Sequence, residues 1–133
     1  MIGLFNGLGV IHKEVKMTIL NNGKQDLIFL IGGSITSIPT YIHIGSGSGV
    51  TNIAAGSLRA FEDAQIRSSP TYPAVNKVKI TADWNSVEMS GLELTEFGLA
   101  KAATGSIYSR TSLPNINFDG SNELRIEETW EVF

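Results

Sequence analysis

The chain contains no cysteine among its 133 residues. Disulfide bonds, thiolate nucleophiles and cysteine-ligated zinc are therefore excluded, although this absence does not identify a redox compartment. Charged residues are also scarce, at 17% of the chain against 42% hydrophobic residues. A globular chain with so little charge suits a protein that packs against neighbouring molecules, because charged residues are depleted at the centre of interfaces.

Long apolar runs and clustered basic residues are also lacking. The run Leu27-Ile-Phe-Leu-Ile31 is far shorter than the roughly 20 residues that span a membrane. The N-terminus, Met1-Ile-Gly-Leu-Phe5, lacks the basic start and cleavage site of a signal peptide, so we expect no export. The ten Lys and Arg residues are scattered and the net charge is −3. We therefore expect neither a membrane nor a nucleic-acid partner.

Alternation of apolar and polar residues is the main pattern that is present. It occurs in Lys77-Val-Lys-Ile-Thr-Ala-Asp-Trp84 and again between Glu123 and Phe133. The apolar rows are Val78, Ile80, Ala82 and Trp84 in the first segment, and Leu124, Ile126, Trp130 and Val132 in the second, which Glu128 interrupts. Such alternation is typical of half-buried antiparallel strands. Trp84 and Trp130 are therefore predicted to anchor the core.

Shorter runs extend the β pattern. Val15, Met17 and Ile19 alternate with polar residues, and the Asn-Gly pair in Asn21-Asn-Gly-Lys24 favours a tight hairpin turn. A returning strand is then predicted over residues 26–31. Another strand is predicted over residues 107–113, where Pro114 is expected to end it.

Helix signals are weak. Residues 57–66 have the capping serine and apolar spacing for about two helical turns, but an extended edge strand is favoured there. Seven or eight short strands separated by Gly, Asn and Pro predict an all-β fold, an antiparallel β-sandwich that is jelly-roll-like or an open barrel, with at most one short helix. Residues 1–133 are expected to form a single β-sandwich domain.

The run Gly45-Ser-Gly-Ser-Gly49 follows a predicted strand, which is where a glycine-rich turn can hold a phosphate. A phosphate loop needs a lysine soon after its last glycine, and here Val50 follows. A dinucleotide site needs a glycine in place of Val50 and then a helix, which the next residues do not favour. We predict a bend whose glycines supply positive φ angles or close backbone approach, with no cofactor.

The two histidines, His12 and His43, do not predict a metal site, because no third ligand lies near them in the pattern. His43 lies opposite Ile42 and Ile44 in the alternation, so we expect it to face solvent or a partner. No Gly-x-Ser-x-Gly elbow with an acid and a histidine is present, which argues against a serine hydrolase.

An acidic group near the middle of the chain is the remaining candidate for catalysis: Asp83, Glu88, Glu93 and Glu96. Glycoside hydrolysis needs paired carboxylates across a sugar-binding cleft, and the sequence provides no aromatic residues to line one. Glu96 differs from the others because its neighbours are apolar. We predict that it forms a buried structural ion pair with Arg110 or Arg59, and we predict no catalytic residues.

Six segments follow one another in a recognisable order between Tyr41 and the C-terminus. They are Ile42-His-Ile-Gly-Ser-Gly47, Leu58 to Arg67, Val78 to Trp84, Glu96-Phe-Gly-Leu99, Gly105-Ser-Ile-Tyr-Ser-Arg110 and Glu123 to Phe133. This order resembles a widespread family of small structural proteins of tailed-bacteriophage virions. The most specific pieces are Glu96-Phe-Gly-Leu99 and Ser109-Arg110 at this spacing, whereas the N-terminal quarter shows only a general β pattern.

The resemblance implies a non-enzymatic virion component that is assembled in the host cytoplasm. A capsid decoration or cement protein is preferred over a protein of the tail or its fibres. The implied partners are major capsid or tail proteins and further copies of the same chain in a homo-oligomer, with no cofactor. The alternative is a carbohydrate- or receptor-binding β-sandwich, in which loops bearing Tyr41, Tyr72 and Tyr108 stack on sugars.

Overall fold

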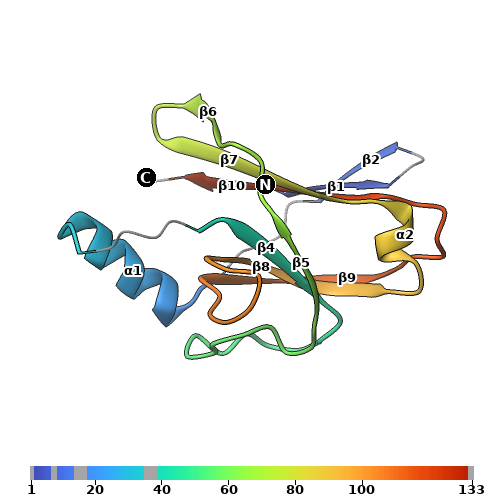
Figure 1. The fold of residues 1–133 in the computed structure, drawn as a ribbon, viewed down its shortest axis with the longest axis horizontal. Helices are drawn as coiled ribbons and strands as arrows, with labels where there is room; N and C mark the ends of the chain where they lie inside the picture. Colours follow the sequence, from blue (N-terminus) through green and yellow to red (C-terminus); the bar gives the residue numbers. More distant parts are fainter. Residues whose placement is uncertain (1, 7–8, 14–17, 35–38, 132–133) are drawn as a thin grey trace. The chain divides into compact units, whose positions relative to one another are not determined.

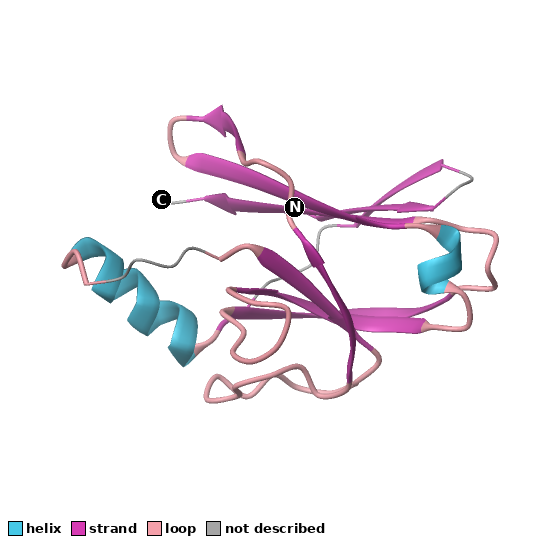
Figure 2. Ribbon diagram, viewed as in Figure 1, coloured by secondary structure: helices cyan, strands magenta, loops and turns pink. Residues whose placement is uncertain are grey.

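The structure is a computed structural model that describes residues 2–6, 9–13, 18–34 and 39–131. Strands predominate, as Figures 1 and 2 show. The elements in chain order are β1 (Ile2–Asn6), β2 (Gly9–Lys13), β3 (Thr18–Ile19), α1 (Asn21–Ile31), β4 (Tyr41–Gly45), β5 (Phe61–Ile66), β6 (Thr71–Ala74), β7 (Lys77–Trp84), α2 (Ser86–Met89), β8 (Glu93–Ala100), β9 (Ser109–Asn117) and β10 (Leu124–Glu131). The predicted class is confirmed, because the strands form two antiparallel sheets with open edges.

The first sheet has the strand order β2-β1-β10-β7-β6 and belongs to a compact unit built from residues 1–15, 67–92 and 117–133. Its longest ladder joins β10 to β7, from Leu124 opposite Trp84 to Glu131 opposite Lys77. β7 has the bounds that the alternation predicts. Apolar side chains at alternate positions of the two strands are buried: Ile80, Ala82, Trp84, Leu124 and Ile126.

The two tryptophans differ in burial. Trp84 is 1% exposed, as expected of a core anchor. Trp130 is only half-buried and lies outside the buried core, which departs from the prediction that both tryptophans anchor it. Its indole Nε1 is nevertheless enclosed without a hydrogen-bond partner among the described residues. Glu128 occupies the same row and is buried, while Val132 lies outside the described residues.

The second sheet has the order β3-β9-β8-β4-β5 and belongs to a unit built from residues 16–66 and 93–116. β4 is paired on both sides, with β5 and with β8. β9 joins this ladder where the Tyr108 N–H donates to the Leu99 carbonyl at 2.6 Å. Leu20, Leu58, Ala100 and Ile107 form a buried apolar cluster in this unit.

The hairpin and returning strand predicted for residues 21–31 are wrong, because this segment forms α1. The N–H groups of Leu20 and Asn21 donate to the carbonyls of Tyr108 and Ile53, both at 2.8 Å. Gly23 lies so close to Tyr108 that a Cβ there would be 2.5 Å from its carbonyl oxygen. The Asn-Gly pair therefore allows the first helical turn to approach Tyr108, and this long-range contact overrides the hairpin preference of the pair.

Residues 61–66 form the edge strand β5, which agrees with the favoured extended structure and rules out a helix there. The single turn α2 was not predicted. Its N-terminus is a capping box in which the Asn85 side chain and the Glu88 side chain each accept a 2.8 Å hydrogen bond from the other residue's backbone N–H.

Pro114 does not end the strand that contains it, and β9 continues to Asn117. The described residues of β3 pair with β9 at Ser109 and Arg110, ahead of Pro114 in the strand. Of the residues predicted to alternate before the turn, Ile19 lies in β3. Val15 and Met17 lie outside the described residues.

Candidate functional site

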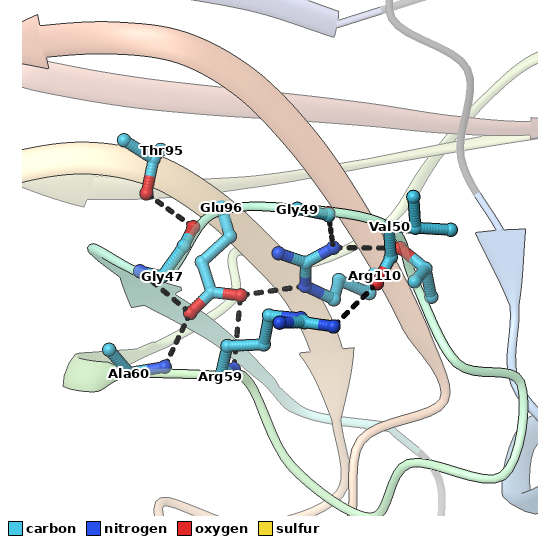
Figure 3. A network of polar contacts seen from close by, with 9 residues as sticks. Gly47, Gly49, Val50, Arg59, Ala60, Thr95, Glu96 and Arg110 are labelled. Carbon is cyan, nitrogen blue, oxygen red and sulfur yellow. Dashed lines mark hydrogen bonds and ion pairs between the residues drawn. The ribbon is translucent and has the colours of Figure 1, made fainter.

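Glu96 and Arg110 form a buried ion pair in the second sheet (Figure 3). Arg110 Nε donates to Glu96 Oε2 at 2.7 Å, and the two side chains are 1% and 0% exposed. β8 supplies Glu96 and β9 supplies Arg110. The predicted pair is present, with Arg110 and not the Arg59 guanidinium as the charged partner.

Backbone N–H groups complete the coordination of the Glu96 carboxylate. Oε1 accepts from Gly47 at 3.1 Å and from Ala60 at 2.7 Å, while Oε2 also accepts from Arg59 N–H at 3.1 Å. The Arg59 guanidinium points elsewhere, with Nη2 donating to the Val50 carbonyl at 3.0 Å. One carboxylate therefore joins β8 and β9 to the loop that connects β4 with β5.

These hydrogen bonds determine the charge state of Glu96. Burial alone raises the pKa of a carboxyl group, but hydrogen bonds from Ala60, Arg110 and Arg59 outweigh burial and hold the pKa of Glu96 below its usual range. Glu96 is consequently ionised at neutral pH. Its two oxygens accept four hydrogen bonds, which leaves no lone pair to take a proton from a substrate. The geometry supports a structural role for this carboxylate.

Arg110 is anchored at a second point. Its Nη1 donates to the Gly49 carbonyl at 3.0 Å and to the Thr51 hydroxyl at 2.8 Å. Nη2 has no hydrogen-bond partner among the described residues. The guanidinium therefore links β9 to Gly49 at the end of the Gly-Ser run and, through Glu96, to Gly47 in its middle.

The Gly-Ser run is a packed bend around this carboxylate. A Cβ at Gly47 would clash with the Arg59 Cβ and lie 2.6 Å from Glu96 Oε1. The Gly47 carbonyl also accepts a hydrogen bond from the Thr95 hydroxyl at 2.6 Å, which fixes the other end of this residue. Gly49 has a φ of +99°. The run thus uses both close approach and a positive φ, the two backbone features proposed for it from the sequence.

Gly98, in the segment Glu96-Phe-Gly-Leu99, is also required by a close approach of two strands. A Cβ at Gly98 would collide with the Ser109 carbonyl oxygen, so this glycine allows β8 and β9 to approach. Gly47, Glu96, Gly98 and Arg110 come from three of the segments that carry the phage resemblance. In this chain those three segments meet around one buried ion pair, with Gly47 against the Glu96 carboxylate and Gly98 against Ser109, the residue before Arg110, and their spacing therefore has a structural explanation.

His43 is 2% exposed, so the expectation that it faces solvent or a partner is wrong. Phe61, the first residue of the neighbouring strand β5, packs against the His43 ring edge to face at 5.0 Å between ring centroids. Nε2 lies 2.7 Å from the Ala102 carbonyl, which can only accept, so Nε2 carries the proton. Burial lowers the pKa of His43, which keeps the ring neutral.

A hollow of about 400 Å³ opens beside His43. Phe61, Ser57, Thr104 and Ser106 also line it, and none of its described lining residues is a carboxylate that could orient the imidazole as in a hydrolase triad. The side chain of His12, in β2, is outside what the structure describes.

The three tyrosines proposed as a recognition surface do not share one environment. Tyr108 is buried, with Lys101 Nζ 5.8 Å from its ring centroid, so it is not available for stacking on a sugar. Tyr41 is half-buried in β4. Only Tyr72, on β6, is strongly exposed, at 73%. The prediction of an interaction surface that includes Tyr108 is therefore wrong.

No group of three or more His, Asp or Glu side chains is placed to hold a metal ion within residues 2–6, 9–13, 18–34 and 39–131. No described helix is long and apolar enough to cross a membrane.

The exposed apolar residues of α1 are a surface feature that the sequence pattern did not predict. Leu27, Ile28, Phe29, Leu30 and Ile31 are all exposed. The available signal was five consecutive large apolar residues with no alternation, because a half-buried strand would alternate.

Comparison with protein-family models, curated proteins and solved structures finds no match to this chain. The functional conclusion therefore depends on the residues and their geometry.

Proposed function

We propose that this chain is a non-enzymatic structural component of a tailed-bacteriophage virion, placed on the capsid as a decoration protein. One observation carries the proposal: three of the six segments that resemble the phage family meet around the Glu96–Arg110 pair, with Gly47 against the carboxylate and Gly98 against the Ser109 carbonyl next to Arg110. The resemblance thus involves residues that determine how the second sheet is built. A carboxylate whose acceptors are all used also favours a scaffold over an enzyme.

The surface supports an assembly role. A charge-poor chain with exposed apolar side chains is suited to contacts with other proteins. Many copies on one particle can bind firmly through individually modest contacts, because each attached neighbour raises the effective concentration of the next. Placement on the tail or its fibres is the alternative within the same proposal.

The decisive experiment localises the protein in particles. Antibody against the purified chain, detected by gold labelling in electron microscopy, is expected to decorate the capsid of virions from cells that express the gene. Label on the tail would select the alternative location. Absence of the chain from purified virions, by mass spectrometry, would overturn the proposal.

The alternative function, sugar or receptor binding by exposed tyrosines, now depends on Tyr72 alone. Tyr72 is the only one of the three candidate tyrosines that presents most of its surface. A glycan array tests this alternative: binding that Tyr72→Ala abolishes would favour sugar recognition over assembly.

A further inference from the structure

The C-terminal half of α1 is apolar on every side. Its five side chains, Leu27, Ile28, Phe29, Leu30 and Ile31, are between 44% and 77% exposed, and α1 has no buried residue. Successive helical residues are rotated by about 100°, so five in a row cover the whole circumference. We call these five residues the apolar end of α1. A helix that is apolar all round is normally enclosed by other protein.

The helix is anchored at its other end. Backbone contacts attach its first turn to Tyr108, just before β9, and to Ile53 in the loop between β4 and β5. Lys101 Nζ pairs with Asp26 at 3.0 Å just before the apolar end begins. Figure 1 shows α1 extending from this attachment away from the strands of its own unit. The apolar end is therefore held out from its sheet by a fixed base.

The backbone at this end is ready for burial. The carbonyls of Ile28, Phe29 and Leu30 accept hydrogen bonds from Gly32, Ser34 and Gly33 at 3.0, 2.8 and 3.0 Å. Helix ends normally leave such carbonyls without partners, and burying them unsatisfied costs free energy. Here the last turn satisfies them internally, so the helix end can enter an apolar environment.

We infer that the apolar end of α1 is a self-association surface, through which copies of this chain pack against one another. The surface is its own complement, because apolar side chains bind other apolar side chains. The charged residues of α1 are Lys24 and Asp26, of opposite sign and both before Leu27, so no like charges oppose a second copy. Natural proteins that avoid self-association place such charges within the apolar surface.

The exposed area of the apolar end of α1 is large enough for a contact with a second copy of the chain. Taking roughly 150–250 Å² for a large side chain, the five residues expose on the order of 500 Å². Two copies together would bury about 1,000 Å², which is the lower limit for a specific interface. A membrane surface is less suited, since interfacial helices carry a basic polar face and α1 has one lysine.

The first experiment measures molar mass by sedimentation over about a hundredfold range of concentration. The wild type is expected to associate, and Ile28→Lys with Ile31→Lys is expected to weaken association by about 100-fold or more. The matched control is Val75→Lys with Val87→Lys, which adds the same charge at two strongly exposed valines outside α1. Because α1 buries no side chain, the helix variant should retain the circular dichroism of the wild type.

The second experiment uses the absence of cysteine. Leu30→Cys introduces the only thiol of the chain, and mild oxidation is expected to yield disulfide-linked dimers. Val75→Cys, at a fully exposed position, is the control and should form few disulfide-linked dimers.

Three results would overturn the inference: a monomeric wild type at every concentration, equal weakening by the control variant, or a monomer that binds phosphatidylcholine vesicles. The purified chain suffices for these measurements, so their failure would leave the virion proposal standing.

Discussion

At the residue scale, Glu96 is the fully buried carboxylate of an ion pair with Arg110 in the second sheet. Removing one member of a buried ion pair leaves the other charge without a partner in a low-dielectric environment. We predict that Glu96→Gln lowers the free energy of unfolding by about 3–5 kcal/mol, measured by urea denaturation.

The chain contains a matched control for that substitution. Arg125 Nε donates to Asp83 Oδ1 at 2.6 Å, nearly the distance of the buried pair, but these side chains are 47% and 59% exposed. Asp83→Asn should therefore cost under about 1 kcal/mol. Equal losses for the two variants would show that burial does not determine the strength of the Glu96 contact.

Acid titration is a second test at this scale. The pKa values of His43 and Glu96 are both lowered in the folded chain, from ordinary values of 6.5 and 4.5. The unfolded chain therefore binds each proton more readily, so each stabilising contribution is full above the ordinary pKa and is lost as the pH falls through the folded pKa. We predict that the free energy of unfolding decreases first below about pH 6.5 and further below about pH 4.5.

His43→Gln separates the two decreases. Glutamine cannot be protonated, so this variant should lose the part of the first decrease that His43 causes and retain the second. Unfolding measured in urea between neutral and acidic pH provides the comparison. The same slope for variant and wild type between pH 7 and 5 would exclude His43 as the titrating group.

At the element scale, the loop between β4 and β5 is built around the Glu96 carboxylate. Gly47→Ala places a methyl group against the Arg59 side chain and the carboxylate. We predict a loss of about 1–3 kcal/mol in the free energy of unfolding, since the loop must move to accommodate it.

Gly56→Ala in the same loop is the control. Nothing lies within 4 Å of a Cβ at Gly56, so this variant should be neutral or slightly stabilising. A harmless Gly47→Ala variant would mean that the loop shifts freely and does not depend on its contact with Glu96.

Elements also differ in how far local sequence predicts them. β7 and β10 were predicted because one face of each strand is buried and the other is polar, which produces a period of two. β4 and α1 were harder, for opposite reasons. Both faces of β4 are buried, so alternation cannot show whether His43 lies inside or outside. In α1 the last five residues are apolar and exposed, so the sequence shows no helical period of apolar and polar residues.

At the scale of the whole molecule, distant chain segments build each sheet. β10 lies between β1 and β7, which come from the beginning and the middle of the chain. Glu127 is opposite Gly3 on one side and Thr81 on the other. We predict that Glu127→Pro costs about 2–3 kcal/mol or more, because it removes a ladder hydrogen bond between two paired strands.

The edge strand β6 is the comparison for that substitution. Its register with β7 is irregular between Thr71 and Ala74, so Tyr72→Pro should be far less costly. Chemical denaturation followed by tryptophan fluorescence measures both variants. Similar losses of unfolding free energy for Glu127→Pro and Tyr72→Pro would contradict the central position of β10 in the sheet.

The sequence alone determined the β class, the bounds of β7 and the pairing of Glu96 with an arginine, because alternation and an acid among apolar neighbours are local properties; that the arginine is Arg110 and not Arg59 was decided by the tertiary structure. Tertiary structure decided that Asn21 begins a helix, that His43 and Tyr108 are buried, and that Gly47 contacts Glu96. Each of these depends on residues far apart in the sequence, such as Gly23 against Tyr108 and Glu96 against Ala60. Such contacts arise only when the strands assemble, and no local pattern encodes them.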